Sequence, residues 1–407
     1  MKAKEYWLYL EPYTFINYNS NLVFIYNTVS CESFTIPLSP LLFGIVKEIS
    51  DYKNMYCVSI DEFARKDKSV DAFLNMIRNS FSGDIIPVVK SQDKPIVMPP
   101  ICNIQNDVTK GLRSNFNIMK YLHEIHINIT GECFFNCQHC SDFYSQIGYC
   151  KNNSSILSFD SVILLLSQLN FALNKVVFFG GDIFNCGYFE KLIDYLHFNK
   201  YNVLFELCCD NILNNIDKLD LINGFTLNIL LNSAVRNDDL CRLEYYSKLS
   251  NVDINFIYPV FSESDYNCAL DFINDGKVLK IIPIYTGGNI DFFEKYVYLE
   301  EDDLKSIHLS KNNIFINNNI NLNNFGKLYC TANGEIYSNL NRNLIGTIKD
   351  SLVSLVKKEF ELKESWFTVR KDCKPCSGCI YNFLCASPSN YELVIGKYNL
   401  CHVKNYK

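Results

Sequence analysis

Alternating strand-like and helix-like stretches from His123 onward constrain this fold more than any other feature of the sequence. Stretches with the composition of buried strands fall at 123–130, 175–179, 202–208, 225–232, 253–260 and 278–284. Helical periodicity falls at 157–173, 187–198, 212–220, 235–249 and 264–275. Repeated βα units predict an α/β fold with a parallel sheet, curved into a partial (β/α)6 barrel. A functional site is expected beyond the carboxyl ends of the strands.

A cysteine-rich loop follows the first predicted strand. Cys133, Cys137 and Cys140 form a C-x3-C-x2-C pattern, and thiolates at this spacing can bind three irons of a [4Fe–4S] cluster. The fourth iron then lacks a protein ligand and can bind another molecule, whereas a structural zinc site takes four protein ligands. The alternative is a three-cysteine zinc knuckle whose fourth ligand lies elsewhere in the chain.

Small or polar residues follow the next strands. Gly180-Gly181-Asp182 follows the second strand, where the glycines let the backbone approach a ligand and the acid can pair with an ammonium group. An ordinary βα turn is the alternative. Asp210 and Asn211 follow the third strand, and Asn232 and Ser233 follow the fourth, where they either reach a ligand or cap helices. The segment 285–289 follows the sixth strand and is expected to line the same site.

Residues 1–95 read as a separate α+β domain, and residues 96–119, with Pro99 and Pro100, as a linker. The barrel is expected over 120–310 and a further domain over 311–407. In the first domain two extended segments are predicted at 6–18 and 22–37, followed by a helix that starts at Ser39-Pro40 and carries an apolar stripe up to Ile49. A strand at 56–60, a helix at 61–80 and a strand at 84–89 follow.

Five cysteines crowd into the last part of the chain, after a predicted hairpin at 325–339 that turns at Asn333-Gly334 and a predicted helix at 351–361. Thiolates in such a group can close an iron–sulfur cluster, and four of them suit Zn²⁺ equally well. The cysteines are Cys373, Cys376, Cys379, Cys385 and Cys401.

Composition narrows the class of protein. The net charge is −6, from 38 basic and 44 acidic residues, which argues against a nucleic-acid partner. The first residues lack an apolar export signal, and the most apolar run, 162–179, is interrupted by polar residues, so no membrane span is predicted. Eighteen cysteines without an export signal indicate reduced thiols and metal ligands, and a cytoplasmic location.

The cysteine loop and the Gly-Gly pair together resemble the signature motifs of radical S-adenosylmethionine (SAM) enzymes. The resemblance implies that Cys133, Cys137 and Cys140 hold a [4Fe–4S] cluster whose open iron binds SAM. It also implies SAM contacts from the second motif, from the residue before the last loop cysteine and from strand ends. These are Gly180, Gly181, Asp182, His139, Asn232 and Ser233. The family usually has Glu where Asp182 stands and an aromatic residue where His139 stands.

The carboxyl-terminal part resembles the SPASM extension of radical SAM peptide-modifying enzymes, which carries two auxiliary clusters. Asn339 and Ser389 stand where that extension has cysteine, so one auxiliary [4Fe–4S] cluster is expected and the other is expected to be lost. The expected ligands are Cys376, Cys379, Cys385 and Cys401.

The segments 285–287 and 387–402 add a resemblance to Bacteroidales-type maturases of double-glycine-leader peptides. This implies a ribosomally synthesised precursor peptide, whose leader binds a winged-helix-like first domain as an added strand. It also implies an electron donor such as flavodoxin or ferredoxin and a pseudo-radical-SAM partner. The alternatives are a non-catalytic leader-binding pseudo-enzyme and a radical SAM enzyme acting on another substrate, such as a sulfatase. No catalytic residue is assigned, because Cys208 and Cys209, which could be proposed as hydrogen donors, read rather as buried structural thiols.

Overall fold

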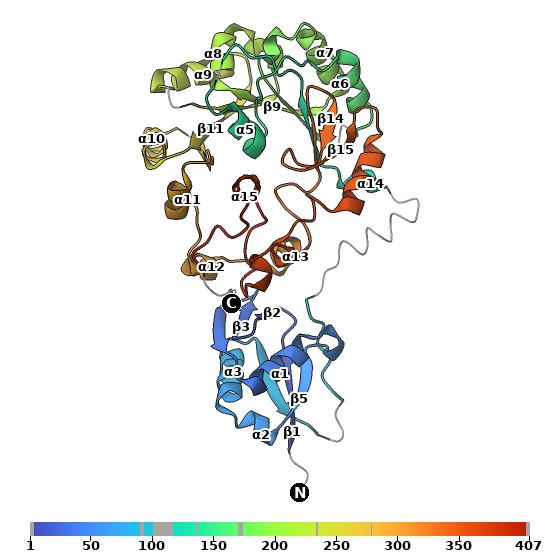
Figure 1. Ribbon diagram of the computed structural model, residues 1–407, viewed down its shortest axis with the longest axis vertical. Coiled ribbons are helices and arrows are strands. Elements are labelled where there is room, and N and C mark those ends of the chain that lie inside the picture. The colour runs from blue at the N-terminus through green and yellow to red at the C-terminus, as the bar shows by residue number, and fades with distance from the viewer. Residues whose placement is uncertain are drawn as a thin grey trace.

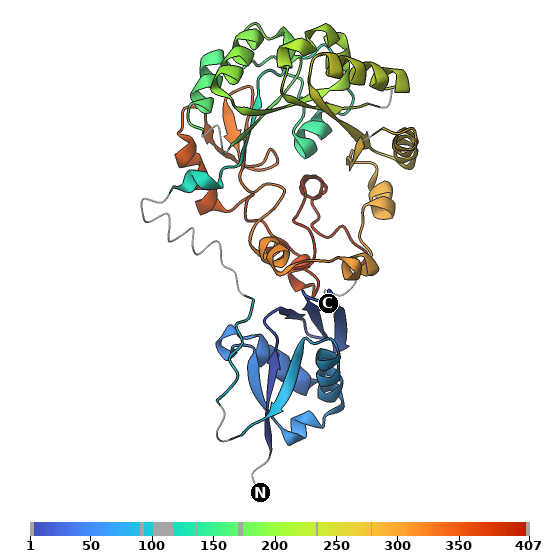
Figure 2. The same ribbon diagram turned by 180° about the vertical axis from the view of Figure 1, so that it is seen from behind.

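The computed structural model describes residues 4–89, 93–100, 117–135, 137–169, 174–232, 235–277 and 279–403. They form a small amino-terminal unit and a larger unit from residue 117 onward (Figure 1). The small unit lies at one end of the long axis of the molecule, and Figure 2 shows the same arrangement from behind.

The larger unit is built on a nine-stranded sheet in the order β12-β11-β10-β9-β8-β7-β13-β14-β15. All six predicted strands are present as parallel neighbours, which confirms a mixed α/β fold with a large parallel sheet. Their bounds are β7 (Glu124–Asn128), β8 (Lys175–Phe179), β9 (Asn202–Cys208), β10 (Thr226–Leu230), β11 (Asp253–Val260) and β12 (Leu279–Pro283). The sheet curves, with helix α5 (Cys140–Ile147) on its inner side (Figures 1 and 2).

Alternation along the strands separates an apolar outer face from a polar inner face. In β7, Ile125 and Ile127 are fully buried in the core that joins the sheet to the outer helices. The alternate positions Glu124 and His126 belong to the inner face and line a cavity there. The outer helices are α6 (Phe159–Leu166), α7 (Phe189–Asn199), α8 (Cys209–Asn214), α9 (Asn237–Leu249) and α10 (Glu263–Asn274).

Two predicted helices differ from the structure. The helix predicted at 157–173 ends at Leu166, and residues 170–173 lie outside the described part of the chain. The helix predicted at 212–220 is α8 followed by a 3₁₀ segment, Ile216–Ile222, with a break at Asn215. The Asn215 side-chain amide donates to the Asn211 carbonyl at 2.9 Å, and such side-chain bonds to the backbone compete with helix continuation.

The hairpin predicted at 325–339 is present, and Gly334 has the positive φ (+78°) that its turn needs. Its first strand, β13 (Lys327–Cys330), pairs in parallel with β7, so the hairpin extends the main sheet. The remaining elements of this region are α11 (Ile290–Tyr296), α12 (Glu301–Ser306), α13 (Lys311–Asn319), β14 (Glu335–Tyr337), β15 (Leu344–Thr347), α14 (Leu352–Leu362) and α15 (Asn390–Ile395).

The amino-terminal unit contains two antiparallel three-stranded sheets, β5-β1-β6 and β2-β3-β4. Its predicted helix at 61–80 is two helices, because Asp61 caps the first and Asp67 caps the second. Its predicted extended segments are likewise divided by turns. The elements are β1 (Glu5–Leu10), β2 (Thr14–Tyr18), β3 (Leu22–Asn27), β4 (Ser33–Pro37), α1 (Pro40–Ser50), β5 (Cys57–Asp61), α2 (Glu62–Arg65), α3 (Lys68–Asn79) and β6 (Gly83–Pro87).

The sheet β2-β3-β4 packs against the cysteine-bearing segment near residue 380. The ring of Phe24 lies 4.8 Å from that of Tyr381 and 5.7 Å from that of Phe383. The Asn17 side-chain amide donates to the Ile380 carbonyl at 3.0 Å. Phe24 and Tyr381 are fully buried in a core that the two units share, so the units are packed together.

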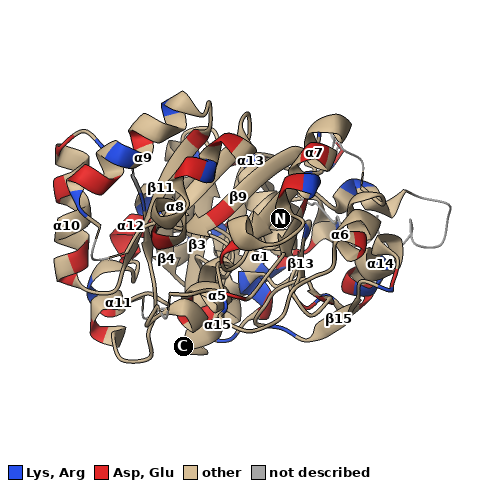
Figure 3. Ribbon diagram, turned by 90° about the horizontal axis from the view of Figure 1, so that it is seen from above, with Lys and Arg blue, Asp and Glu red and all other residues tan. Residues whose placement is uncertain are grey.

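Charged side chains and helix length are the two remaining features of the fold. Acidic and basic residues are interspersed along the helices of the larger unit (Figure 3). Over the residues described, every helix is too short or too polar to cross a bilayer.

Candidate functional site

The cysteine loop lies where β7 ends, and backbone hydrogen bonds hold it on two sides. The Gly131 amide donates to the Ser155 carbonyl at 2.9 Å, and the Glu132 amide donates to Thr130 Oγ1 at 3.0 Å. The Asp182 amide donates to the Glu132 carbonyl at 2.8 Å, which ties the loop to the turn after β8. The two motifs that the sequence places at one sheet edge therefore lie side by side.

Glycine is required in that turn because the cysteine loop passes so close. Gly180 has φ +143°, and a Cβ atom there would lie 2.5 Å from the Thr130 carbonyl oxygen. A Cβ atom at Gly181 would lie 1.9 Å from the Glu132 carbonyl oxygen. From the sequence, these glycines are expected to let the backbone approach a ligand. In the structure they also leave room for the backbone of the cysteine loop itself.

Changing Gly181 to alanine is expected to lower the free energy of unfolding by about 1–3 kcal/mol, since the Glu132 carbonyl must move to accept the methyl group. Urea denaturation followed by circular dichroism measures the change. Gly187→Ala is the matched control, because no atom lies within 4 Å of a Cβ built there. Equal stability of the two variants would show that the loop yields freely.

The loop thiols lie together, and Cys150 joins them. Hydrogen bonding with Cys150 lowers the pKa of Cys133, and hydrogen bonding with Cys137 and then Cys150 lowers the pKa of Cys140. The same contacts raise the pKa of Cys137 and Cys150, so protons are shared within the group. Metals bind to thiolates, and the lowered pKa values of Cys133 and Cys140 favour the thiolate form of these two residues.

Asn211 connects the cysteine loop to the glycine turn. Its side-chain amide donates to the Gly181 carbonyl at 3.0 Å, and its Oδ1 accepts from Cys133 Sγ at 3.7 Å. The residue is 1% exposed and lies in the first turn of α8, directly after β9. The Asn211 side chain therefore helps to position both motifs. It does not cap α8, the alternative that the sequence allows, because Cys208 is at the cap position.

Asp182 is buried, and both of its carboxylate oxygens are engaged. Oδ2 accepts from Asn185 at 2.6 Å, and Oδ1 accepts from Asn215 at 3.3 Å. A carboxylate accepts about four hydrogen bonds, so capacity remains for a ligand. Asp182 lines a cavity of about 530 Å³ together with Cys133 and Phe134.

His139 lies between the loop and the strand ends. Its ring stacks on Phe261 with centroids 4.5 Å apart, and its Nδ1 lies 3.1 Å from Asp142 Oδ2. Phe261 follows β11 directly, so this stacking brings the cysteine loop into contact with the carboxyl end of β11.

Asn232 and the segment 285–289, two more of the predicted strand-end sites, have structural partners. Asn232 donates to Asp210 Oδ2 at 2.8 Å, and Ser233 lies outside the described residues. The segment 285–289 is held by Gln146 of α5, which donates to the Tyr285 carbonyl at 2.7 Å and accepts from its amide at 2.8 Å.

Four carboxyl-terminal cysteines form a second group. Besides burial, electrostatic interactions with Cys379, Cys376 and Cys401 raise the pKa of Cys385, which indicates that the four thiols lie near one another. Burial raises the pKa of Cys379 to about 11 and that of Cys385 to about 12. Buried thiols of this kind stay protonated unless a cation compensates, and a metal centre supplies that charge.

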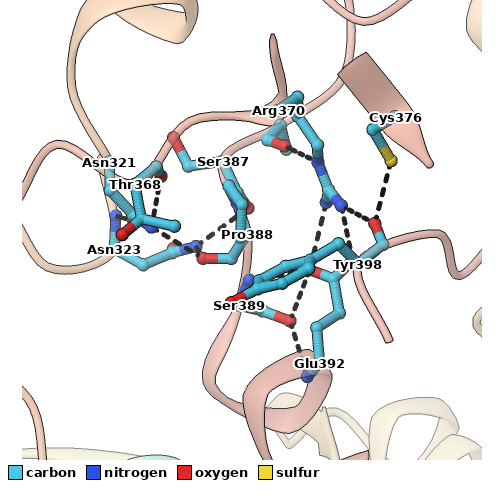
Figure 4. A network of polar contacts seen from close by, with 11 residues as sticks. Asn321, Asn323, Thr368, Arg370, Cys376, Ser387, Pro388, Ser389, Glu392 and Tyr398 are labelled. Atoms are coloured by element: carbon cyan, nitrogen blue, oxygen red, sulfur yellow. Dashed lines mark hydrogen bonds and ion pairs between the residues drawn. The ribbon is translucent and has the colours of Figure 1, made fainter. Parts of the chain in front are cut away.

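Arg370 is the cation beside this group, and Figure 4 shows its contacts. Its guanidinium pairs with Glu392 in a bidentate ion pair, at 2.5 Å from Nη1 and 3.0 Å from Nη2. It also donates to the carbonyls of Ala386 and Tyr398, and Cys376 Sγ donates to the Tyr398 carbonyl at 3.2 Å. The arginine thus holds the chain segments that carry the cysteines.

The two positions where cysteine would be expected are occupied by hydrogen-bond networks. Asn339 is 1% exposed and donates to Asn324 at 2.9 Å and Asn390 at 2.7 Å. Ser389 caps helix α15, and its amide donates to Glu392 Oε2 at 2.7 Å. Both side chains are committed to holding α15.

The two cysteine groups have the chemistry of ligands for soft metal centres. Among the residues described, no three His, Cys, Asp or Glu side chains are arranged as ligands of a single ion. The first set consists of thiols at one sheet edge, and the second consists of buried thiols beside an arginine. Thiolates select zinc and iron–sulfur clusters, so the residues fit the expected groups.

Sequence reasoning did not assign Cys150, Arg370 or the role of Asn211. Cys150 reads as one more small apolar residue, and only the end of α5 at Gly148 (φ +73°) indicates that the chain turns back there. Arg370 lies beside the cysteines because it donates to the carbonyls of Ala386 and Tyr398, which are 16 and 28 residues later in the chain. Contacts over such sequence distances leave no local pattern.

No protein-family model matches this chain, and no curated protein matches it. Two solved structures are similar over 98% of this chain and 100% of theirs. They are Streptococcus suis SuiB bound to S-adenosylmethionine (12% identity, TM-score 0.44) and SuiB bound to precursor peptide SuiA (12% identity, TM-score 0.45). At these TM-scores the likeness assigns neither a family nor an activity to this chain.

Proposed function

We propose that this chain is a radical SAM enzyme that modifies a ribosomally synthesised precursor peptide. The observation that carries the proposal is the grouping of the Cys133, Cys137 and Cys140 thiols beside the Gly180–Gly181 turn, at one carboxyl edge of a parallel sheet. When bound, a [4Fe–4S] cluster supplies the electron that cleaves SAM and so starts hydrogen abstraction from the substrate.

In this proposal, the residues of the chain bind the cluster and orient SAM. The three loop cysteines hold the cluster, and Asp182 accepts from the SAM amino group with its remaining lone pairs. His139, fixed on Phe261, contacts the adenine side, and Asn232 and Ser233 reach the ribose side. These contacts follow from the motif resemblance, and the positions of Asp182 and His139 beside the cysteine loop support their part in them.

The second cysteine group holds one auxiliary [4Fe–4S] cluster in the proposal. Mutual proximity of Cys376, Cys379, Cys385 and Cys401 supports a single four-thiolate site. Asn339 donates to Asn390 and Ser389 caps α15, so both residues have structural roles at α15. These roles support the loss of a second auxiliary cluster. Zinc at the same four thiols is the competing occupant.

The amino-terminal unit is the proposed capture site for the leader of the precursor. Its two sheets present β5, β6, β2 and β4 as edge strands, and an edge strand can accept an added strand. The sheet β2-β3-β4 packs on residues 380–383, so a leader added to β2 or β4 would lie near the second cysteine group. A flavodoxin or ferredoxin donor, a pseudo-radical-SAM partner and a cytoplasmic location belong to the same proposal.

Anaerobic reconstitution with iron and sulfide is expected to load about eight irons per chain, because two cubic clusters hold four each. With a chemical reductant and SAM, the reconstituted chain is expected to release 5′-deoxyadenosine. Iron and sulfide assays and chromatography of the nucleoside measure both quantities.

Other results would contradict parts of the proposal. About twelve irons would mean that ligands other than Asn339 and Ser389 complete a third cluster. About four irons with bound zinc would assign the second group to zinc. A fully loaded chain without nucleoside release would support the rival function, a leader-binding pseudo-enzyme whose clusters only stabilise it.

A further inference from the structure

A polar cavity lies on the inner side of the curved sheet, separate from the cysteine groups. Its volume is about 600 Å³, and inner-face side chains of strands β7 to β13 line most of it. Asn390 and Tyr391 of α15 line another side, and no cysteine is among the described lining residues. Tyr149 stands at the boundary with the apolar cluster formed by Phe143, Leu230 and Ile257.

Three buried polar atoms of residues that line this cavity lack a hydrogen-bond partner among the residues described. They are Nδ1 of His126, Oη of Tyr149 and Oε2 of Glu206. Buried polar groups are nearly always paired, and each unpaired one calls for an explanation. Their presence around one cavity indicates a polar ligand.

The His126 ring is held firmly in place. Its Nε2 lies 3.1 Å from Glu124 Oε2, and the ring stacks on Tyr329 with centroids 4.5 Å apart. Its Nδ1 lies 3.9 Å from Glu206 Oε2, too far for a hydrogen bond. The imidazole and the carboxyl group therefore face the same space without satisfying each other.

Charge around the cavity favours an anionic ligand. Three lysines line it against two glutamates. Lys327 lies 3.6 Å from Glu124, whereas Lys175 lines the cavity without an ion pair to another described residue. The hydrogen bond with His126 keeps the pKa of Glu124 low, at about 2, so this carboxylate is already charged and committed.

We propose that this cavity binds a carboxylate group, held by the Lys175 ammonium, the Tyr149 hydroxyl and the carboxyl group of Glu206. The ammonium neutralises the ligand, and the hydroxyl and the carboxyl group each donate one hydrogen bond. Binding at this cavity does not depend on the cysteine sites. The carboxylate belongs either to a small free acid or to an acidic side chain of a peptide.

Glu206 gives the binding a pH dependence. Burial raises the pKa of Glu206 above its usual value, in spite of nearby cations, so the group holds a proton more readily than a free carboxyl. The protonated form donates to the ligand, so affinity falls as the pH rises through that raised pKa. Affinity also falls at low pH, where the ligand carboxylate itself takes up a proton. The groups that face Glu206 are Glu124, His126, Tyr149, Lys175, Asn228, Lys280, Lys327 and Tyr329.

Titration calorimetry on the full-length reconstituted chain tests the proposal. The probes are succinate, a blocked tripeptide with a central glutamate, neutral succinamide and ethylammonium. We expect saturable binding of at least one carboxylate probe and none of succinamide. Lys175→Gln is expected to weaken that binding about tenfold or more, since a charged hydrogen bond is lost.

Matched variants separate the cavity from general charge effects. Lys357→Gln makes the same charge change at an exposed position on α14 and is expected to leave binding unchanged. Tyr149→Phe is expected to weaken binding several-fold without changing the shape of the site. Glu206→Gln keeps a donor, so it is expected to retain binding while removing its pH dependence.

The two carboxylate probes distinguish the sources. Tighter succinate binding assigns the cavity to a free acid, and tighter binding of the peptide assigns it to an acidic side chain. The proposal is overturned if neither carboxylate binds saturably, if Lys175→Gln binds as tightly as the unchanged chain, or if ethylammonium binds in preference. The last outcome would assign the cavity to a cation.

Discussion

Replacing Cys137 with alanine is expected to abolish 5′-deoxyadenosine release and to halve the iron content, from about eight to about four per chain. A cube with two protein ligands is poorly held, whereas the second cysteine group does not involve this loop. The fold should survive, because the loop residues around Cys137 are partly exposed and the sheet beneath them does not change. Cys133→Ala and Cys140→Ala are expected to behave in the same way.

Iron assay, nucleoside chromatography and circular dichroism on the same preparation test this expectation. Cys268→Ala is the matched control, because that thiol is exposed on α10 and belongs to neither group. The proposed function fails if Cys137→Ala and a Cys137→Ala, Cys150→Ala double variant both release the nucleoside at the unchanged rate. Full release by Cys137→Ala but not by a Cys137→Ala, Cys150→Ala double variant would instead make Cys150 a replacement ligand.

Replacing Glu392 with alanine is expected to lower the free energy of unfolding by about 3–5 kcal/mol, because it leaves the Arg370 guanidinium buried without its counter-charge. The side chains of Arg370 and Glu392 are 12% and 2% exposed, so water cannot replace the lost pairing. The variant also removes the cap contacts with Ser389, which adds to the loss.

A second variant tests whether the unpaired charge causes this loss. Arg370→Met combined with Glu392→Leu removes both charges, and it is expected to be more stable than Glu392→Ala alone. Urea denaturation of the three chains measures the difference. If the double variant is as unstable as the single one, the hydrogen bonds to Ala386 and Tyr398, and not the charge balance, account for the stability of this region.

The parallel sheet could be predicted from the sequence because each strand and helix carries a local pattern. All six strands appear where their β-branched and aromatic residues indicate. The pairing of β13 with β7 could not be predicted, since it joins residues some 200 positions apart and leaves no periodic signal. The breaks at Asn215 and Asp67 were missed because one side-chain amide or carboxylate outweighs helical periodicity locally.

The candidate site shows a similar division. Spacing alone identifies Cys133, Cys137 and Cys140, because ligands on one short loop leave a pattern in the sequence. Cys150 and Asn211 reach the same place from other elements, and their types are too common to stand out. The polar cavity was not predicted either, because His126 and Glu206 belong to different strands and meet only when the sheet curves.

The shared core between the amino-terminal unit and residues 380–383 has a thermodynamic consequence. Phe24 and Tyr381 cannot separate without exposing buried aromatic surface, so the two parts stabilise each other. Any metal that binds the folded cysteine segment must then also stabilise the amino-terminal sheets, and any peptide that binds those sheets must raise the affinity for that metal. This linkage is reciprocal, so occupancy of either part can be read from the melting behaviour of the other.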